Sequence, residues 1–275
     1  MFFHHIPDAK AIGAHRGVRS LAPENTLPAI EKALHCGAHF LEIDVRLTAD
    51  GHLVVFHDDT PARTTNIAAS PLAARATHHV DTFTLTELQS LDAGSWFAAT
   101  DPHGTIRSGE IPPEAVDAFA GTVIPTLRQV LDFCRDHAFP INVEIKDHAG
   151  RTGDSAITAA VLELVADTET RDLALLSSFN HRYLTQAAVF DPDIPRAALI
   201  ETAHPGNILD YLMFLDVAAC HPDHHITPPD LARALLDDGL RVNLWTINDP
   251  DVARAYPPGA GIITDLPQRF VSPRG

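Results

Sequence analysis

The stretch of sequence that decides the fold is FLEIDVRLTADGHLVVFH, residues 40–57. Its first part, Phe40–Val45, is a short and mostly apolar run that predicts a buried strand. A second strand-like run, His52–Phe56, follows too closely for a parallel crossover, which needs about a dozen linking residues. Asp50-Gly51 lies between them and is a strong hairpin turn pair, so we expect His52–Phe56 to return as an antiparallel arm. This pairing places His57 near residues 42–44.

Outside the hairpin, short apolar runs alternate with stretches in which apolar residues have helical spacing, as in Leu127–Cys134 and Ile157–Val165. The predicted strands are Ala11–Ala14, Phe40–Val45, Ile141–Lys146, Leu173–Ser178, Ala197–Ile200, Asp216–Ala219, Val242–Thr246 and Gly261–Thr264. Eight strands that alternate with helices in about 250 residues favour a (β/α)8 barrel of the TIM type over an open sheet. The sequence contains no glycine-rich nucleotide-binding loop.

The segment from about residue 59 to residue 121 breaks the alternation. It is rich in turn residues, and helical spacing indicates one short helix near Leu85–Leu91. We interpret the segment as an insertion after the second barrel strand, on the face where barrel active sites lie, and expect it to cap the site. Since no linker or internal repeat divides the chain, the prediction is a single barrel domain over residues 1–275 that carries this insertion.

The composition narrows the class of protein. The 275 residues carry 20 Lys+Arg against 36 Asp+Glu, a formal net charge of −16, and hydrophobic residues make up 45%. This is the composition of a soluble globular protein, and its acidity argues against a nucleic-acid partner or an anionic membrane. No apolar run is long enough to span a bilayer, and the N-terminal residues do not resemble a secretory signal. The three cysteines are far apart, so we expect reduced thiols in a cytoplasmic protein without stable membrane anchoring.

Glu42 and Asp44 are at alternate positions of one predicted strand, so their carboxylates point to the same side. Inside a barrel this acidic pair is unfavourable without compensation, and carboxylate oxygens suit a divalent cation such as Mg²⁺ or Ca²⁺. Glu144 and Lys146 repeat the spacing on another strand. The alternative is that both pairs are surface positions on half-buried strands.

His15-Arg16-Gly17 ends the first predicted strand. An imidazole can transfer protons near neutral pH, and a guanidinium can bind phosphate oxygens in a fork. Pro23-Glu24-Asn25-Thr26 then begins a helix. Taken alone, the first motif is equally consistent with a surface loop and the second with an ordinary helix N-terminus.

In combination these motifs resemble the glycerophosphodiester phosphodiesterase family, in order and in spacing over nearly the whole chain. The residues that carry the resemblance are Ala14–Gly17, Pro23–Thr26, Leu41–Val45, Asp50-Gly51, Val54–Asp58, Leu91–Phe97, Ile124–Leu127, Val143–Lys146, Leu244–Asn248 and Thr264-Asp265.

The resemblance implies a distorted (β/α)8 barrel that hydrolyses glycerophosphodiesters, such as glycerophosphocholine, to sn-glycerol 3-phosphate and an alcohol. It implies that His15 and His57 are the acid/base pair. It also implies that the binding partner is a small-molecule substrate, and that the protein is a monomer or a homodimer. The residues that it implies hold Mg²⁺ or Ca²⁺ are Glu42, Asp44 and Glu144. Those implied to contact the substrate are Arg16, Lys146 and Trp245. Glu24 and Asn25 are implied to shape the site. The likeness to phosphatidylinositol-specific phospholipases C favours attack by the glycerol hydroxyl, through a cyclic phosphate, over attack by water.

Two alternatives use the same site. One is a phosphodiesterase that acts on lysophospholipids or a cyclic phosphate, with an apolar rim supplied by Phe83, Trp96, Phe97 and Phe119. The other is a barrel without catalysis that serves as a metal-dependent binding module. Intact His15 and His57 argue against the second alternative.

A few further residues have an ordinary structural interpretation. His221, among other histidines in turn-like segments, is expected in a solvated loop. Ser177-Ser178 ends a strand, and either contacts substrate or caps the next helix. Thr264-Asp265, at the end of the last strand, is expected to support the floor of the pocket.

Overall fold

The hairpin at residues 40–57 forms as the sequence predicts. In the computed structural model, which describes residues 1–272, β2 (Phe40–Leu47) turns back into β3 (Leu53–Val55). The two strands pair antiparallel with Val45 opposite Val55, and the backbone N–H of Phe56 donates to the carbonyl of Asp44 at 2.9 Å. This register brings His57 back beside the end of β2.

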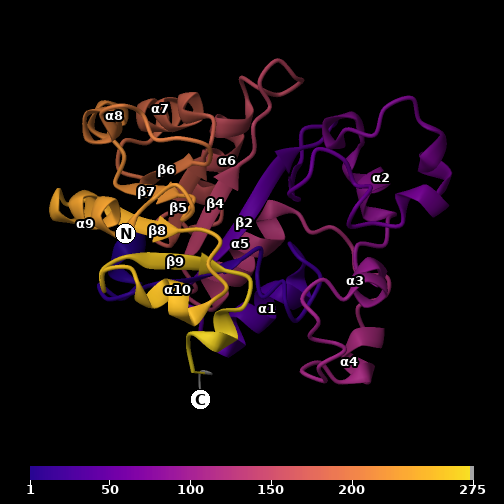
Figure 1. Ribbon diagram of the computed structural model, residues 1–275. Coiled ribbons are helices and arrows are strands. Elements are labelled where there is room, and N and C mark those ends of the chain that lie inside the picture. Colours follow the sequence, from indigo (N-terminus) through magenta and orange to yellow (C-terminus); the bar gives the residue numbers. More distant parts are fainter. Residues whose placement is uncertain (273–275) are drawn as a thin grey trace.

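Eight parallel strands form the closed barrel (Figure 1). They are β1 (Ile12–His15), β2, β4 (Ile141–Ile145), β5 (Ala174–Ser178), β6 (Arg196–Ile200), β7 (Ala219–Pro222), β8 (Arg241–Leu244) and β9 (Gly261–Thr264). Neighbours pair in the order β1-β9-β8-β7-β6-β5-β4-β2, and β1 also pairs with β2, which closes the ring. The (β/α)8 prediction is confirmed; the last three residues of the predicted domain over 1–275 lie outside the described residues.

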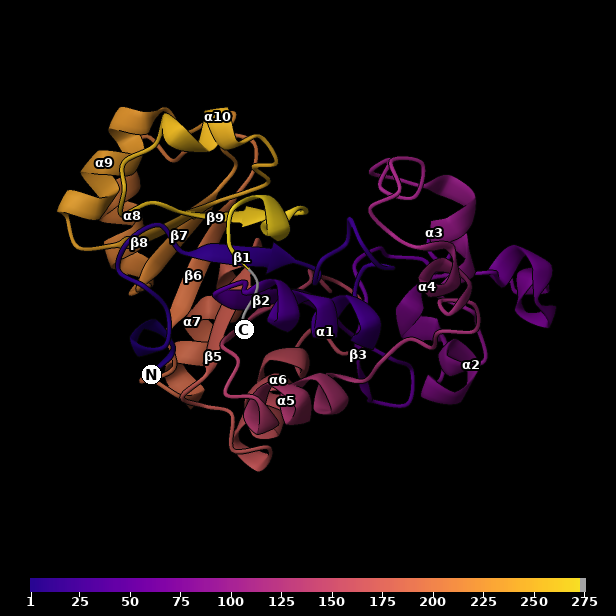
Figure 2. The same ribbon diagram turned by 90° about the horizontal axis from the view of Figure 1, so that it is seen from below.

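Helices cover the outside of the barrel between successive strands (Figures 1 and 2). They are α1 (Leu27–Cys36), α5 (Leu127–Asp136), α6 (Ile157–Asp167), α7 (His181–Phe190), α8 (Ile208–Leu215), α9 (Pro229–Asp237) and α10 (Pro250–Arg254), and short 3-10 turns lie near the two ends of the chain at Phe2–His4 and Pro267–Arg269. Within residues 1–272, no helix is both long enough and apolar enough to cross a membrane.

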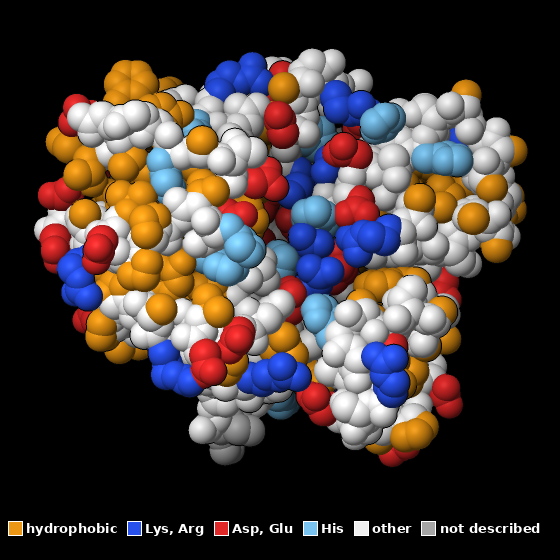
Figure 3. All heavy atoms as spheres, viewed as in Figure 1, with side chains coloured by type: hydrophobic (Ala, Val, Ile, Leu, Met, Phe, Trp, Pro, Cys, Tyr) orange, Lys and Arg blue, Asp and Glu red, His pale blue; other side chains and the backbone are white. Residues whose placement is uncertain are grey.

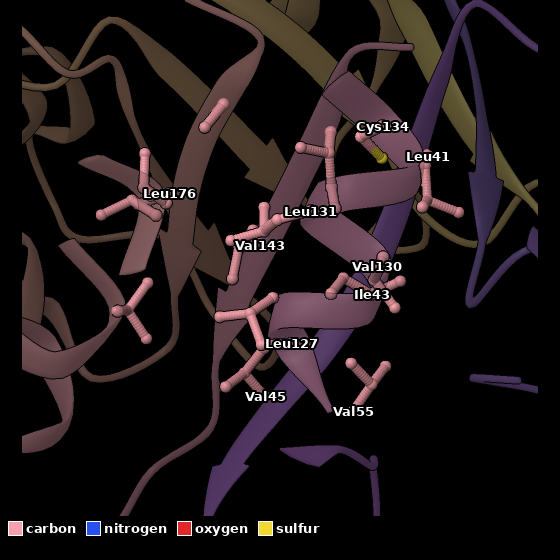
Figure 4. Close-up of a cluster of buried hydrophobic side chains, with 14 of the residues drawn as sticks. Leu41, Ile43, Val45, Val55, Leu127, Val130, Leu131, Cys134, Val143 and Leu176 are labelled. Atoms are coloured by element: carbon pink, nitrogen blue, oxygen red, sulfur yellow. The ribbon is translucent and has the colours of Figure 1, made fainter. Parts of the chain in front are cut away.

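The largest apolar core lies between the barrel wall and its helices. α5 packs its apolar stripe against the outward side chains of β2 and β4, as Figure 4 shows. The residues labelled there are Leu41, Ile43, Val45, Val55, Leu127, Val130, Leu131, Cys134, Val143 and Leu176. Because outward positions on β2 are apolar, its alternate positions Glu42 and Asp44 face the barrel interior.

Residues 59–121 lie to one side of the barrel in both views (Figures 1 and 2). The predicted short helix is present as α2 (Leu85–Gln89), but the expectation of only one helix is wrong. The segment also contains α3 (Ser95–Thr100), α4 (Pro113–Asp117) and 3-10 turns at Ile67–Ala69, Pro71–Ala74 and Val80–Thr82. These elements are too short to show a periodic apolar pattern, which is why the sequence did not reveal them.

The two ends of this segment meet at the hairpin. Val54 in β3 forms an isolated antiparallel bridge with Thr126, and the N–H of Val55 donates to the carbonyl of Pro125 at 2.9 Å. The chain therefore leaves the hairpin and returns to it at adjacent positions.

One predicted strand is displaced. Asp216–Ala219 was expected to be a strand, but Asp216 ends α8 in the left-handed conformation, and β7 begins at Ala219. Apolar residues continue from Val217 through Cys220 in the sequence, so hydrophobicity alone does not show that strand pairing begins only at Ala219 and runs on to Pro222.

Gly94 gives a test of how the segment packs. A Cβ at this position would lie 1.8 Å from the backbone carbonyl oxygen of Phe119, which cannot move without shifting the chain. We expect Gly94→Ala to destabilise the protein by about 1–3 kcal/mol, the usual range for overpacking. The measurement is the midpoint of urea unfolding.

Gly206→Ala is the matched control, because a Cβ there meets nothing within 4 Å. Equal unfolding midpoints for the two variants would contradict the packing described for Gly94.

Candidate active site

A pocket of about 610 Å³ opens at the carboxyl ends of the barrel strands. The residues that line it are His15, Arg16, Glu42, Arg46, His57, Asp59, Asn142, Glu144, Lys146, Asp147, Phe179, Leu199, Glu201, Trp245, Thr246 and Ile263. Figure 3 shows histidine, basic and acidic side chains gathered in the middle of this face, between the barrel and the segment that holds α2–α4. Of the predicted site residues, Asp44, Glu24 and Asn25 lie behind this lining.

Three carboxylates converge inside the barrel. Asp44 pairs in register with Glu144 across β2 and β4, and one oxygen of each of these two and of Glu42 lies within 4.8 Å of the others. Burial, together with the neighbouring negative charges of Asp44 and Glu144, raises the pKa of Glu42 well above its usual value. Burial also raises the pKa of Glu144.

Asp44 behaves differently from its two neighbours. Burial alone raises the pKa of this carboxyl, but nearby basic groups, His57 first and then Lys146 and Arg16, outweigh burial and hold the pKa well below its usual value. Lys146 Nζ lies 2.6 Å from Glu144 and 3.4 Å from Asp44, and Arg16 Nε lies 3.3 Å from Asp44. Asn25 adds a hydrogen bond from Nδ2 to Asp44 at 2.8 Å. Two cations and an amide therefore compensate the acidic cluster.

The turn at the end of β1 positions Arg16. Both Arg16 and Gly17 have positive φ, of 55° and 78°, and a Cβ on Gly17 would lie 2.6 Å from the backbone of Ala29. Only glycine fits this second position without strain. As a result the backbone N–H of Arg16 points at Glu42 and donates a 3.0 Å hydrogen bond to its carboxylate.

His15 is paired with Asp265, a residue expected only to support the pocket floor. The Nδ1–H of His15 donates to Asp265 at 2.6 Å, and Asn248 Nδ2 donates to the other oxygen of that carboxylate at 2.8 Å. Burial, followed by the charge of Arg16, lowers the pKa of His15 to about 4. The imidazole is therefore neutral at pH 7, with Nε2 as its free acceptor.

His57 is held at both its side chain and its backbone. Its Nδ1–H donates to Asp58 at 2.7 Å, while Arg46 donates two hydrogen bonds, at 2.9 and 2.7 Å, to its carbonyl oxygen. Arg46 also forms an ion pair with Asp59 at 2.7 Å. Arg46 was not predicted as a site residue, although it continues the alternation of Glu42 and Asp44 on β2, and this spacing of two could have indicated it.

Glu24 is the centre of an arginine cluster. Its carboxylate lies 2.7 Å from Arg16, 2.7 Å from Arg19 and 2.6 Å from Arg63. Burial opposes ionisation, but these arginines lower the pKa of Glu24 to about 2. Arg63 also binds Asp58 at 2.7 Å. Arg19 and Arg63 were not predicted as site residues: both stand in turn-rich sequence without a motif.

Trp245 and Phe179 form one wall of the pocket, with ring centroids 5.6 Å apart in an edge-to-face arrangement. Trp245 Nε1 donates to the carbonyl of His221 at 2.7 Å, which fixes the indole. The four residues that could supply an apolar rim for the lysophospholipid alternative do not line the pocket: Phe83, Phe97 and Phe119 are buried in the cores of the segment over residues 59–121, and Trp96 packs against one of those cores. Of that segment, only Asp59 lines the pocket, and its capping role stays a prediction.

Of the residues given an ordinary interpretation, His221 is located differently, while Ser178 agrees with the helix-capping alternative. His221 is not in a solvated loop but is fully buried on β7, because that strand begins later than predicted. Ser178 donates to the carbonyl of Ile145 at 2.7 Å and accepts from the N–H of Asn180, so it supports the start of α7. Ser177 is fully buried in the barrel.

The carboxylate cluster fits a divalent cation chemically. Glu42, Asp44 and Glu144 offer only oxygen donors, which Mg²⁺ and Ca²⁺ prefer, and two of the three have raised pKa values that a cation would reverse. A second group, Asp223, His224 and His225, also brings potential ligand atoms within 4.8 Å of one another, at the end of β7.

Known proteins of one family are similar to this chain over most of its length. A curated glycerophosphodiester phosphodiesterase of Caldanaerobacter subterraneus is 32% identical over 94% of this chain and 95% of its own length. A solved phosphodiesterase of Oleispira antarctica, in complex with the product sn-glycerol 3-phosphate, is 29% identical with a TM-score of 0.79 and covers 95% of each chain. A putative glycerophosphoryl diester phosphodiesterase structure from Silicibacter pomeroyi is 27% identical with a TM-score of 0.80, covering 98% of this chain and 96% of that one. The profile of the glycerophosphoryl diester phosphodiesterase family matches residues 15–269, so the chain belongs to this family.

Proposed function

We propose that this protein hydrolyses glycerophosphodiesters to sn-glycerol 3-phosphate and an alcohol. The observation that carries the proposal is that His15 and His57, each bonded through Nδ1 to its own carboxylate, lie in one pocket with a buried carboxylate cluster. Two histidines with free Nε2 atoms are what a reaction needs when one proton is removed and another is donated. The names of the relatives support the same reaction.

The proposed roles begin with the cation. Glu42, Asp44 and Glu144 hold Mg²⁺ or Ca²⁺, and the bound ion supplies Lewis-acid stabilisation of the negative charge on phosphate oxygens. Arg16 and Lys146, the cations nearest the cluster, contact the phosphate and stabilise the charge that grows in the transition state. Glu24 and Asn25 hold Arg16 and Asp44 in place.

The proposed proton transfers follow from the hydrogen bonds and positions of the two histidines. His15, neutral at pH 7, accepts the proton of the attacking hydroxyl at Nε2 while the new P–O bond forms. His57, with Asp58 behind it, gives a proton to the departing alcohol oxygen as the old P–O bond breaks. We propose the glycerol hydroxyl as the attacking group, so the first product is a cyclic phosphate that water then opens by the reverse proton transfers.

The outer wall of the pocket suits a cationic alcohol such as choline or ethanolamine. Phe179 and Trp245 present aromatic rings there, and Asp147 and Glu201 add carboxylates. Aromatic faces and carboxylates both attract an organic cation. The burial of Phe83, Phe97 and Phe119 removes the apolar rim that a lysophospholipid chain requires, which favours the water-soluble diesters.

His15→Ala and His57→Ala test the acid/base pair. Each substitution removes one proton-transfer group, so we expect turnover to fall by about 10²–10⁴-fold while the fold is kept. The measurement is release of sn-glycerol 3-phosphate from glycerophosphocholine, with circular dichroism as the check on folding.

His52→Ala is the control on the same hairpin, because His52 is exposed and lies outside the pocket. Near wild-type turnover by both pocket variants would overturn the assignment.

Glu42→Gln tests the cation site. The variant keeps the shape of the side chain but removes one anionic ligand, so we expect the Mg²⁺ or Ca²⁺ concentration for half-maximal activity to rise by about tenfold or more. The wild type should lose activity with a chelator and regain it with either ion. Glu163→Gln, at an exposed position on α6, should leave the titration unchanged. The same titration curve for Glu42→Gln and wild type would contradict the ligand role.

Asp265→Asn tests whether Asp265 positions His15. The amide no longer fixes Nδ1–H of His15 toward the pocket wall, so we expect kcat to fall on the order of 10²–10⁴-fold with little change in KM. Asp237→Asn, on the exposed face of α9, should have no effect. A rise in KM at constant kcat would instead place Asp265 in substrate binding.

A further inference from the structure

A second group of potential metal ligands lies outside the catalytic pocket, in the turn that follows β7. Asp223, His224 and His225 each offer one ligand atom, and these atoms lie within 4.8 Å of one another. None of the three residues lines the pocket that holds His15 and His57. The proposed reaction therefore leaves this group without a role.

Two of the three side chains are already joined to each other. The Nδ1–H of His225 donates to Asp223 Oδ1 at 2.8 Å, and the backbone N–H of His225 donates to the same oxygen at 2.7 Å. The ring of His224 lies beside that of His225, with centroids 3.8 Å apart and planes tilted by 35°. One carboxylate and two imidazoles therefore lie side by side in a single turn.

The backbone of this turn is held by the neighbouring parts of the barrel. The N–H of Asp223 donates to the carbonyl of Ile200 at 2.8 Å, and the N–H of His224 donates to that of Trp245 at 3.0 Å. The hydroxyl of Tyr256 donates to the carbonyl of His224 at 2.9 Å. Ligands on a fixed backbone lose little conformational entropy when an ion binds, which favours affinity.

An ion can reach the group from solvent. The side chain of His225 is 76% exposed and that of Asp223 is 20% exposed, while His224 is half-buried. Water can therefore complete the coordination, as it does at zinc sites that have three protein ligands.

The donor atoms of the turn differ in kind from those of the carboxylate cluster in the barrel. Glu42, Asp44 and Glu144 offer oxygen alone, whereas the turn offers two imidazole nitrogens and one carboxylate. Mg²⁺ and Ca²⁺ prefer oxygen ligands, and imidazole suits transition-metal ions such as Zn²⁺ and Ni²⁺. The two groups therefore select different ions.

We propose that Asp223, His224 and His225 form a second metal site, for a transition-metal ion of the Zn²⁺ class, beside the catalytic pocket. The bound ion cross-links the side chains of the turn. The turn is itself bonded to the backbone of Trp245, which forms one wall of the pocket, so the ion clamps this wall from behind. The site does not depend on the reaction proposed for the pocket.

Removing one ligand at a time tests the site. The measurement is Zn²⁺ binding to the full chain by calorimetry, with an excess of Mg²⁺ that competes for the carboxylate cluster. We expect His224→Gln, His225→Gln and Asp223→Asn each to raise the Kd of this site about tenfold or more. The control is the double variant His4→Gln/His5→Gln, which removes another exposed pair of adjacent histidines and should leave the Kd unchanged.

Thermal unfolding gives a second readout, because an ion that binds only the folded protein raises its Tm. Zn²⁺ should raise the Tm of the wild type more than that of His224→Gln. Wild-type Zn²⁺ affinity in all three ligand variants would overturn the site. So would wild-type affinity in Asp223→Asn alone, since that result describes a surface histidine pair. Neither readout uses turnover, so failure here is distinct from failure of the proposed hydrolysis.

Discussion

Mutual repulsion among three buried carboxylates is the constraint on which the site depends. Glu42, Asp44 and Glu144 lie too close together, and too far from water, to ionise without compensation. Compensation comes from Lys146, directly after the strand that carries Glu144, and from Arg16 on the turn after β1. In that turn, where Arg16 has a positive φ, both its guanidinium and its backbone N–H reach the cluster.

A chain of ion pairs links the two histidines around this cluster. Asp265 holds His15 and lies 3.5 Å from Arg19, which binds Glu24; Glu24 in turn binds Arg63, and Arg63 binds the Asp58 that holds His57. Most of these side chains are at least partly buried, so solvent screens them less than an exposed pair. Because Arg63 belongs to the segment over residues 59–121, the position of that segment and the orientation of His57 are coupled.

Local patterns in the sequence predicted the barrel and the hairpin because both depend on features a few residues long: strand runs, helical stripes and the Asp50-Gly51 turn. The sequence also predicted the carboxylate cluster, since residues two positions apart have their side chains on the same face of a strand. The pairing of His15 with Asp265 joins residues 250 positions apart, and no local pattern indicates it. Arg63 stands in sequence without periodicity, and His221 was placed in a loop because the predicted strand ended at Ala219, where β7 begins.

The way residues 59–121 join the barrel has a consequence for how such proteins diversify. The chain departs after β3 and returns at Pro125 and Thr126, which are bonded to Val55 and Val54 of that same strand. The two ends of this loop are hydrogen-bonded to the same strand, so its length can change without shifting the strands of the barrel. The entropic free energy of closing a loop rises only slowly with its length. Arg63, near the start of the loop, binds Glu24 and Asp58, so a change beyond Arg63 leaves both these ion pairs and the side chains on β1, β2 and β4 in place.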